Sequence, residues 1–345
     1  MSEEVSLESQ IGSIWDHIKG FHVVHFIYTG HELGLFSLIS SYKKEGISSQ
    51  SIAKEKSLDV NYIDKWCTSG IAWGILDDLQ NSKVCLSPHM DSILTMPGDP
   101  RYLLPYIKSC IDHFGPDMKN HSEYYKNGKI FKFQEHSHDF SYDIGTITEG
   151  LQTLVVNKIL PNIETVNKKL IEGGSLLDFG CGTAKLLIKA SKFFNKSQFY
   201  GLDIDNSGLS IGIDTINSLK LNNKIKLINL NSDNPPEEET IDVVTMVEVF
   251  HEISIEDRAK VLKLIFKLLK KSGYLIIFDE TMPERKNLRD PSSKLSVLTQ
   301  YNEMKWGNIV PRAEEQDKLL LNSGFSIPER KLVGGLFTLL ICKKN

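Results

Sequence analysis

The residues with the clearest chemical potential lie in Leu176-Leu177-Asp178-Phe179-Gly180-Cys181-Gly182-Thr183. Gly180 and Gly182 follow an apolar run, and glycines there let the backbone approach a ligand closely at the start of a helix. Asp203 ends the next apolar run. A carboxylate at that position can accept hydrogen bonds from both hydroxyls of a ribose. These residues predict a site for a cofactor that contains adenosine.

Two details favour S-adenosylmethionine over a nicotinamide dinucleotide as this cofactor. The third glycine of the dinucleotide motif GxGxxG is replaced by Lys185. Asp178 lies two residues before the first glycine, where a carboxylate would repel a pyrophosphate but suits a cationic ligand that carries an amino acid. A nicotinamide-dependent enzyme is the weaker alternative.

A second group of reactive residues, Glu248-Val249-Phe250-His251-Glu252, ends a later apolar run. Methyl transfer to an alcohol or phenol needs a base that removes the proton of the acceptor. We predict His251 and Glu252 as the catalytic residues. The alternatives are that His251 only orients the loop or packs, or that His251 and Glu252 bind a metal.

Aromatic residues and histidines are dense between about 105 and 170. We expect this segment to be helical and to cover the cofactor site. His138 and Tyr142, together with Trp306, are the predicted acceptor-binding residues. The alternative is that these aromatic side chains only pack the parts of the chain together.

The elements that position these residues follow a regular pattern from residue 174 onward. Apolar strands expected at 175–179, 198–203, 225–230, 241–247 and 274–278 alternate with helices, one of them at 256–271. This pattern predicts an α/β fold with a Rossmann-like, doubly wound, seven-stranded sheet. Two final runs, 325–328 and 335–342, have no helix between them, so the last strand should be antiparallel.

The first third of the chain predicts an α-helical winged-helix domain, because two helices and a hairpin follow one another in residues 47–86. Residues 47–82 carry three lysines and five acids, a net charge of −2. Since DNA binding depends on Lys and Arg contacts to phosphates, we expect a homodimer surface instead. The predicted domains are 1–104 for dimerisation, 105–172 as a helical cap, and 173–345 for the cofactor.

In these motifs the chain resembles class I S-adenosylmethionine-dependent methyltransferases, and its organisation resembles their small-molecule O-methyltransferase-like group with an N-terminal dimerisation domain. The resemblance implies that Gly180 and Gly182 line S-adenosyl-L-methionine, that Asp203 holds its ribose and that Asp178 places its methionine end. It also implies an adenine contact after the third strand, for which Asn231 and Asp233 compete, and we assign Asp233. Glu248 is placed with the cofactor residues.

The same pair, His251 and Glu252, also resembles the metal-binding residues of α-keto-acid C-methyltransferases in this group. Those enzymes need a further histidine after the fifth strand, but residues 281–345 contain none. His136 or His138 would have to supply the ligand, so the main prediction includes no metal. A non-catalytic winged-helix regulatory protein is a further alternative.

Composition excludes several classes of protein. The chain has 345 residues, a net charge of −4 and 41% hydrophobic residues, which is typical of a globular protein. It has no apolar run long enough for a membrane span and no basic arm, so we expect neither a membrane nor a nucleic-acid partner. The acidic start, unlike a secretory signal, and five scattered cysteines favour the cytoplasm.

Overall fold

The computed structural model describes residues 5–344 and separates into two compact units, Met1–Pro116 and Asp117–Asn345. Residues 1–4 and 345, the ends of the predicted first and last domains, lie outside the described residues. The separation falls within the predicted cap at 105–172. Residues 117–172 belong with the sheet, because apolar side chains such as Val155 and Leu170 are buried in the same core as Leu176.

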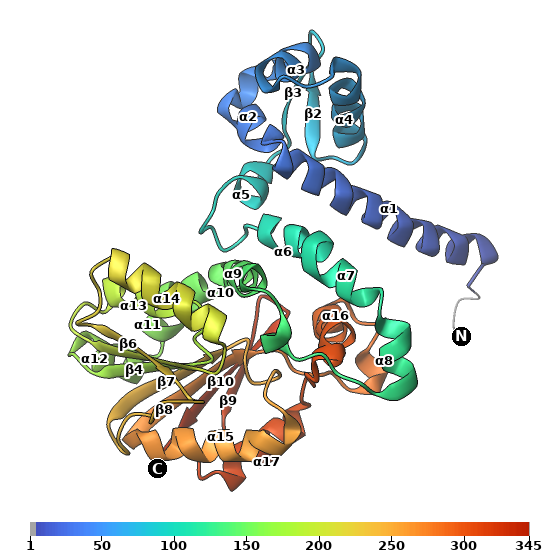
Figure 1. The fold of residues 1–345 in the computed structure, drawn as a ribbon. Coiled ribbons are helices and arrows are strands. Elements are labelled where there is room, and N and C mark those ends of the chain that lie inside the picture. Colours follow the sequence, from blue (N-terminus) through green and yellow to red (C-terminus); the bar gives the residue numbers. More distant parts are fainter. Residues whose placement is uncertain (1–4, 345) are drawn as a thin grey trace. The chain divides into compact units, whose positions relative to one another are not determined.

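The first unit contains the predicted pair of helices and hairpin (Figure 1). Asp59 caps the start of helix α4, because its carboxylate accepts hydrogen bonds from the N–H groups of Asn61 and Tyr62. The strands form an antiparallel sheet in the order β1-β3-β2. The elements of this unit are α1 Leu7–Glu32, α2 Leu35–Ser41, η1 Lys43–Glu45, β1 Ile47–Ser48, α3 Ser49–Lys56, α4 Val60–Ala72, β2 Leu76–Leu79, β3 Lys83–Leu86, α5 Met90–Leu94, α6 Leu104–Ser109 and η2 Cys110–Phe114, with α7 Gly115–Met118 at the boundary.

The second unit is built on a seven-stranded sheet in the order β6-β5-β4-β7-β8-β10-β9. The first five of these strands are parallel, and β10 pairs antiparallel with both β8 and β9. The predicted doubly wound sheet with an antiparallel last strand is therefore confirmed. The strands are β4 Ser175–Phe179, β5 Gln198–Asp203, β6 Ile225–Asn229, β7 Ile241–Val247, β8 Leu269–Asp279, β9 Glu329–Val333 and β10 Phe337–Lys343.

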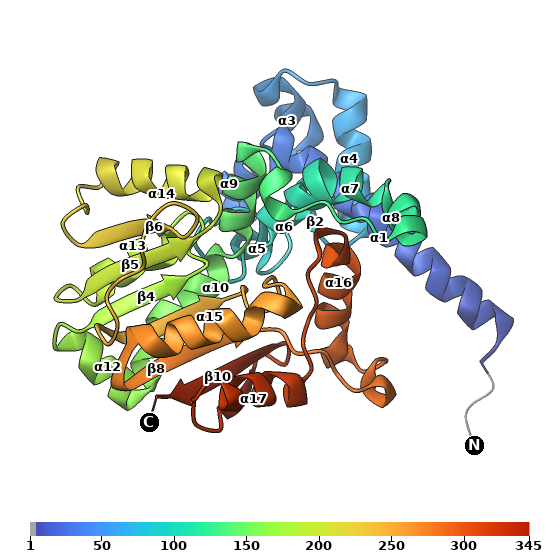
Figure 2. The same cartoon turned by 60° about the horizontal axis from the view of Figure 1, so that its bottom comes forward.

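Helices cover both faces of this sheet (Figures 1 and 2). Leu176 packs on the face covered by α12, α13 and α14, whereas Leu177 packs on the face covered by α15 and α17. Successive residues of β4 are thus buried on opposite sides, as in a parallel sheet between two helical layers. The helices are α8 His121–Asn127, η3 Phe133–Glu135, α9 His138–Ile147, α10 Glu149–Leu154, η4 Val155–Ile159, α11 Leu160–Asn162, α12 Glu164–Ile171, α13 Lys185–Phe193, α14 Asn206–Ser218, α15 Ile255–Leu268, η5 Arg285–Asn287, η6 Pro291–Ser293, α16 Lys294–Glu303, η7 Met304–Trp306 and α17 Ala313–Asn322.

Two predicted boundaries are wrong. The helix expected to reach residue 271 ends at Leu268, because Leu269 already pairs with Ile241 in the sheet and Lys270 bonds to Asp242 at 2.7 Å. Residues 325–328 form no strand beyond a single bridge from Phe325. Pro328 cannot donate to a ladder, so β9 begins after it.

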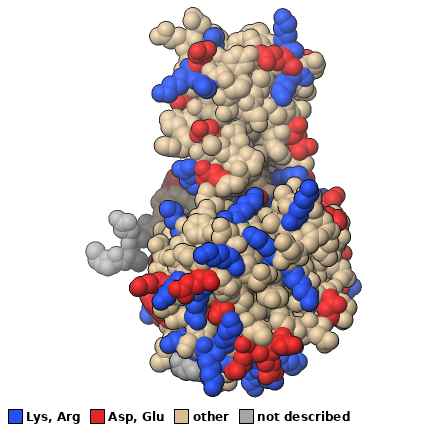
Figure 3. Space-filling model, turned by 90° about the vertical axis from the view of Figure 1, so that its left-hand side faces the viewer, with Lys and Arg blue, Asp and Glu red and all other residues tan. Residues whose placement is uncertain are grey.

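The distribution of charged and apolar residues agrees with the near-neutral net charge and the moderate hydrophobic content of the sequence. Basic and acidic side chains are interspersed over the face drawn in Figure 3. Among residues 5–344, no helix is both long and apolar enough to cross a membrane.

Candidate active site

The glycine loop follows β4 and turns sharply back toward the sheet. Gly180 and Gly182 have φ angles of +75° and +46°, a region that favours glycine. A Cβ atom at Gly180 would lie 2.5 Å from the side chain of Val249. The loop is therefore held close to the chain that follows β7, and a larger residue at 180 would displace it.

Asp203 lies beside this loop, as the sequence predicts. Its carboxylate accepts hydrogen bonds from three backbone N–H groups, those of Gly182 at 2.6 Å, Ile204 at 2.7 Å and Asp205 at 2.9 Å. The carboxylate thus fixes the glycine loop against the end of β5. A carboxylate has about four lone-pair sites, so with three taken, about one remains to accept a hydrogen bond from a ribose hydroxyl.

Asp178 is buried just before the loop. Its Oδ1 accepts a hydrogen bond from the Thr245 hydroxyl at 2.7 Å. Burial raises the pKa of Asp178 to about 8. An ammonium group bound beside it would favour the ionised form, since an opposite charge opposes the effect of burial.

The two competing adenine residues have different local roles. The Asn231 amide donates to the backbone carbonyl of Ile204, next to Asp203, at 3.2 Å. Asp233 accepts from the N–H of Asn229 at 3.1 Å and so stabilises the turn after β6. Asp233 as the adenine contact stays a prediction.

Glu248 directly follows β7 with a φ of +56°, and its N–H donates to the carbonyl of Phe278 at 2.9 Å. Its Oε1 is shielded from solvent and has no hydrogen-bond partner among the described residues. Burial raises the pKa of Glu248, and the nearby carboxylates of Asp279 and Glu280 raise it further. A ligand that donates a hydrogen bond would satisfy this oxygen.

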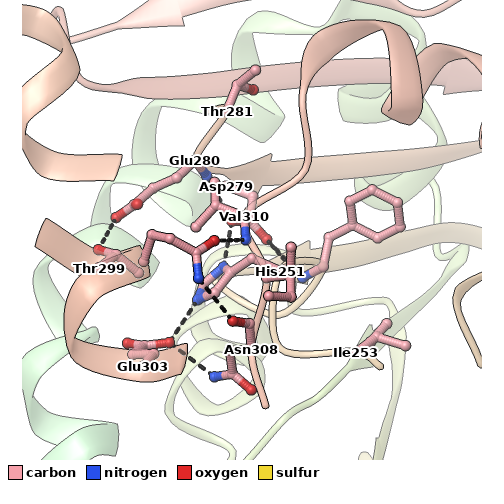
Figure 4. A network of polar contacts seen from close by, with 12 residues as sticks. His251, Ile253, Asp279, Glu280, Thr281, Thr299, Glu303, Asn308 and Val310 are labelled. Atoms are coloured by element: carbon pink, nitrogen blue, oxygen red, sulfur yellow. Dashed lines mark hydrogen bonds and ion pairs between the residues drawn. The ribbon is translucent and has the colours of Figure 1, made fainter. Parts of the chain in front are cut away.

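His251 is the centre of a buried polar network at the ends of β7 and β8 (Figure 4). Its Nδ1 lies 2.6 Å from Asp279 Oδ1, and its Nε2 lies 3.2 Å from Glu303 Oε2. Asp279 also accepts hydrogen bonds from the N–H groups of Phe250 and His251, at 2.6 and 3.2 Å. Asp279 therefore holds both the loop and the imidazole ring in place.

The Asp279 carboxylate can only accept, so the imidazole proton is on Nδ1 and Nε2 of a neutral ring carries a lone pair. Nε2 therefore faces the carboxylate oxygen of Glu303, which also carries lone pairs. A positive species must lie between them, either a proton or a metal ion. The two neighbouring carboxylates raise the pKa of His251 well above its usual value, although burial alone would lower it. One ligand atom from each of His251, Glu252 and Glu303 lies within 4.8 Å of the others.

Three acids of this network are outside the predicted set: Asp279, Glu280 and Glu303. Glu303 lies on α16 and also accepts from the Asn308 amide at 2.9 Å. One turn earlier, the Thr299 hydroxyl donates to Glu280 Oε1 at 2.8 Å, while Glu280 Oε2 is buried without a partner among the described residues. The position of Glu280 after a strand could have suggested its role, but Glu303 has no distinguishing sequence signal.

The three predicted acceptor-binding residues differ in burial and in contacts. Trp306 is 5% exposed and packs edge-on against Phe133, His136 and Phe140. Tyr142 is 51% exposed, with its ring 5.4 Å from the Lys185 ammonium. The His138 side chain is mostly exposed on α9. The assignments of these residues to the acceptor stay predictions.

Comparison with known proteins agrees with this geometry. Residues 177–275, which include the glycine loop, Asp203 and His251, match a family model described as a methyltransferase domain. This part of the chain is therefore similar to methyltransferase domains. The chain is 25% identical over 167 residues to the ubiquinone/menaquinone biosynthesis C-methyltransferase UbiE of Vibrio vulnificus, covering 48% of this chain and 62% of that protein. It is 29% identical over 119 residues to an uncharacterized protein of Rickettsia prowazekii, covering 34% of this chain and 47% of that protein.

Solved structures share the fold over the whole chain, including the helical part before the methyltransferase domain. Human N-acetylserotonin methyltransferase in complex with SAM has a TM-score of 0.76 at 14% identity, and the match covers 100% of both chains. The pyocyanin biosynthetic protein PhzM has a TM-score of 0.75 at 15% identity, covering 98% of this chain and 99% of that one. Both the α/β fold and the helical N-terminal region are thus those of these methyltransferases.

Proposed function

We propose that this chain is an S-adenosylmethionine-dependent methyltransferase that acts on a small-molecule acceptor, with oxygen as the favoured methyl acceptor atom. The observation that carries the proposal is the glycine loop fixed by Asp203 next to the buried Asp178. A sulfonium cofactor with an amino-acid end supplies the charges that this loop and these carboxylates complement. The proposed cofactor residues are Gly180, Gly182, Asp203, Asp178, Asp233 and Glu248.

His251 is the proposed base. Methyl transfer is an in-line displacement, in which the acceptor oxygen attacks the sulfonium methyl carbon and thioether sulfur leaves. Asp279 accepts a hydrogen bond from Nδ1–H, so Nε2 is the atom that can take the acceptor proton. Because the raised pKa of His251 favours the imidazolium, the proton on Nε2 must leave first, and Glu303 is its nearest acceptor. The carboxylates of Glu252, Glu280 and Glu303 stabilise the imidazolium that results.

Calorimetric titration tests the proposal. The chain should bind S-adenosylmethionine and S-adenosylhomocysteine, and Asp203→Ala should weaken both, since it removes the acid beside the loop. Transfer of a labelled methyl group to a panel of small phenols would then identify the acceptor. Absence of binding of both cofactor forms would contradict the proposed function.

A second candidate function is a metal-assisted C-methyltransferase that acts on an α-keto acid. It is favoured by the donor set of His251, Glu252 and Glu303, in which Glu303 takes the place of the expected histidine. Hydrogen bonding of a metal-binding imidazole to a carboxylate, here Asp279, is typical of metal sites. A divalent ion held there would polarise the carbonyl of the keto acid.

Metal analysis separates the two candidates. Under the metal-assisted mechanism, the purified chain retains about one equivalent of a transition metal, and Glu303→Gln loses it. Under the base mechanism, chelation leaves methyl transfer unchanged.

The first unit is proposed to be a winged-helix domain that forms a homodimer. Helix α1 exposes a stripe of large apolar side chains at helical spacing. Such a continuous exposed stripe is typical of a protein–protein interface. The stripe consists of Leu7, Ile11, Ile14, Trp15, Ile18 and Phe21. A second copy of this chain is the proposed partner, nucleic acid and membrane are not, and the cytoplasm is the proposed location.

A further inference from the structure

Lys185 and its neighbours form a polar cluster beside the glycine loop that the proposed mechanism does not use. Lys185 Nζ donates to the Thr146 hydroxyl at 2.7 Å and to Glu149 Oε2 at 3.2 Å. Lys189 Nζ donates to the other oxygen of Glu149 at 2.8 Å. Two ammonium groups thus share the Glu149 carboxylate, so Glu149 stays paired with Lys189 if Lys185 turns to another anion.

Thr183 supplies a second, independent observation at the same place. Its hydroxyl is buried in the loop, with the residue 4% exposed, and has no hydrogen-bond partner among residues 5–344. Helix α13 begins two residues later, and its N-cap, Ala184, has a φ of +61° and makes no side-chain cap. A buried hydroxyl and a helix start without a side-chain cap both favour an anionic ligand.

The charges around the loop show which anion fits. Asp178, on the strand side of the loop, suits an ammonium group. Lys185, on the helix side, suits a carboxylate. Burial lowers the pKa of its ammonium group, and Glu149 and Asp143 oppose that shift, as a bound carboxylate also would. An amino acid carries both groups on one carbon atom, so the two sides of the loop match its two charges.

We propose that Lys185 and Thr183 bind the α-carboxylate at the amino-acid end of S-adenosylmethionine. This assignment rests on the proposed function. It gives a role to the lysine that replaces the third glycine of a dinucleotide motif: the side chain recognises the part of the cofactor that a dinucleotide lacks. Thr146 and Glu149, on α9 and α10, then orient Lys185 in the absence of cofactor.

Two ligands that differ at this end test the assignment. S-adenosylhomocysteine carries the carboxylate and the ammonium, whereas methylthioadenosine carries neither. Lys185→Met should lower the affinity for S-adenosylhomocysteine about 10- to 100-fold, as expected for a lost hydrogen bond to a charged group. The affinity for methylthioadenosine should change less than about twofold, and Lys185→Arg should retain most of the affinity for S-adenosylhomocysteine.

Lys189→Met is the matched control, because Lys189 contacts the same Glu149 from the next turn of α13. It should weaken the binding of S-adenosylhomocysteine less than Lys185→Met does and leave the affinity for methylthioadenosine unchanged. Thr183→Val should weaken S-adenosylhomocysteine selectively, and Thr183→Ser should not. Equal weakening of both ligands by Lys185→Met, or no weakening, would overturn this assignment alone. If the unsubstituted chain binds neither ligand, the proposed function fails with it.

Discussion

At the scale of single residues, the site is a set of buried ionisable groups whose charges depend on one another. His251 lies between Asp279 and Glu303, while Glu248 and Glu280 each present an oxygen without a partner among the described residues. Buried groups of this kind are costly unless a ligand or proton completes them. Their concentration at one edge of the sheet is therefore a property expected of a binding or catalytic site.

Replacement of His251 by Gln should reduce methyl transfer about 100- to 10,000-fold, the usual contribution of a general base. The amide keeps a polar group of similar reach but cannot take a proton at neutral pH. The affinity for S-adenosylhomocysteine should be unchanged, because the His251 ring bonds to Asp279 and Glu303 and to none of the proposed cofactor residues. Single-turnover rates with labelled cofactor measure the effect. Parallel loss of cofactor affinity would indicate that His251 only supports the loop.

Glu280 should make the stability of the chain depend on pH. Burial raises the pKa of its carboxyl group from 4.5 to about 7, so the folded chain holds this proton more tightly than the unfolded chain. Between pH 4.5 and 7 the free energy of unfolding should therefore fall as pH rises, by at most about 1.4 kcal/mol per pH unit. Urea denaturation at several pH values should show a shallower slope for Glu280→Gln. An unchanged slope would contradict this prediction.

At the scale of elements, the site is made by strand ends and by the helices that approach them. The functional residues lie at the carboxyl ends of parallel strands, which meet at one edge of the sheet. The glycine loop follows β4, Asp203 ends β5, His251 follows β7 and Asp279 ends β8. Helix α16 adds Glu303, and helix α9 comes close to the glycine loop at Gly145. A Cβ atom at Gly145 would lie only 2.5 Å from the Thr183 hydroxyl.

Gly145→Ala should therefore separate α9 from the loop. We expect a loss of about 1–3 kcal/mol in the free energy of unfolding of the second unit, as for other overpacked positions, together with weaker cofactor binding. Gly20→Ala is the control, because Gly20 is also helical but has open space around it. That substitution should stabilise α1 by up to about 1 kcal/mol. Calorimetric unfolding compares the two variants, and equal effects would exclude a steric cause.

At the scale of the whole molecule, two compact units have different tasks in the proposed function. The second unit contains the loop, the His251 network and the cluster around Lys185. The first contains the apolar stripe of α1 and the predicted winged-helix region. A homodimer would bury the apolar stripe. Residues 47–82 have a net charge of −2, which does not favour DNA as the partner.

The double substitution Ile14→Asp and Ile18→Asp should convert the dimer into a monomer. Ile14 and Ile18 are 61% and 40% exposed on the same stripe, and two buried carboxylates in an apolar interface are strongly unfavourable. Sedimentation velocity measures the change in mass. Ile327→Asp, at an exposed position of the second unit, is the control and should leave the dimer intact. A chain that is monomeric without substitution would contradict the proposed homodimer.

The sequence by itself determined the alternation of strands and helices and the glycine loop with its acid, because these depend on local apolar periodicity and on short motifs. The order of the strands in the sheet came from the tertiary structure. Gly180, Gly182 and Asp203 are recognisable from their neighbours along the chain. Only the tertiary structure decided that Glu303 faces His251, since 52 residues separate them. It also placed Lys185 against Glu149 across 36 residues. Contacts of this kind depend on how helices pack on the sheet, and no local pattern encodes them.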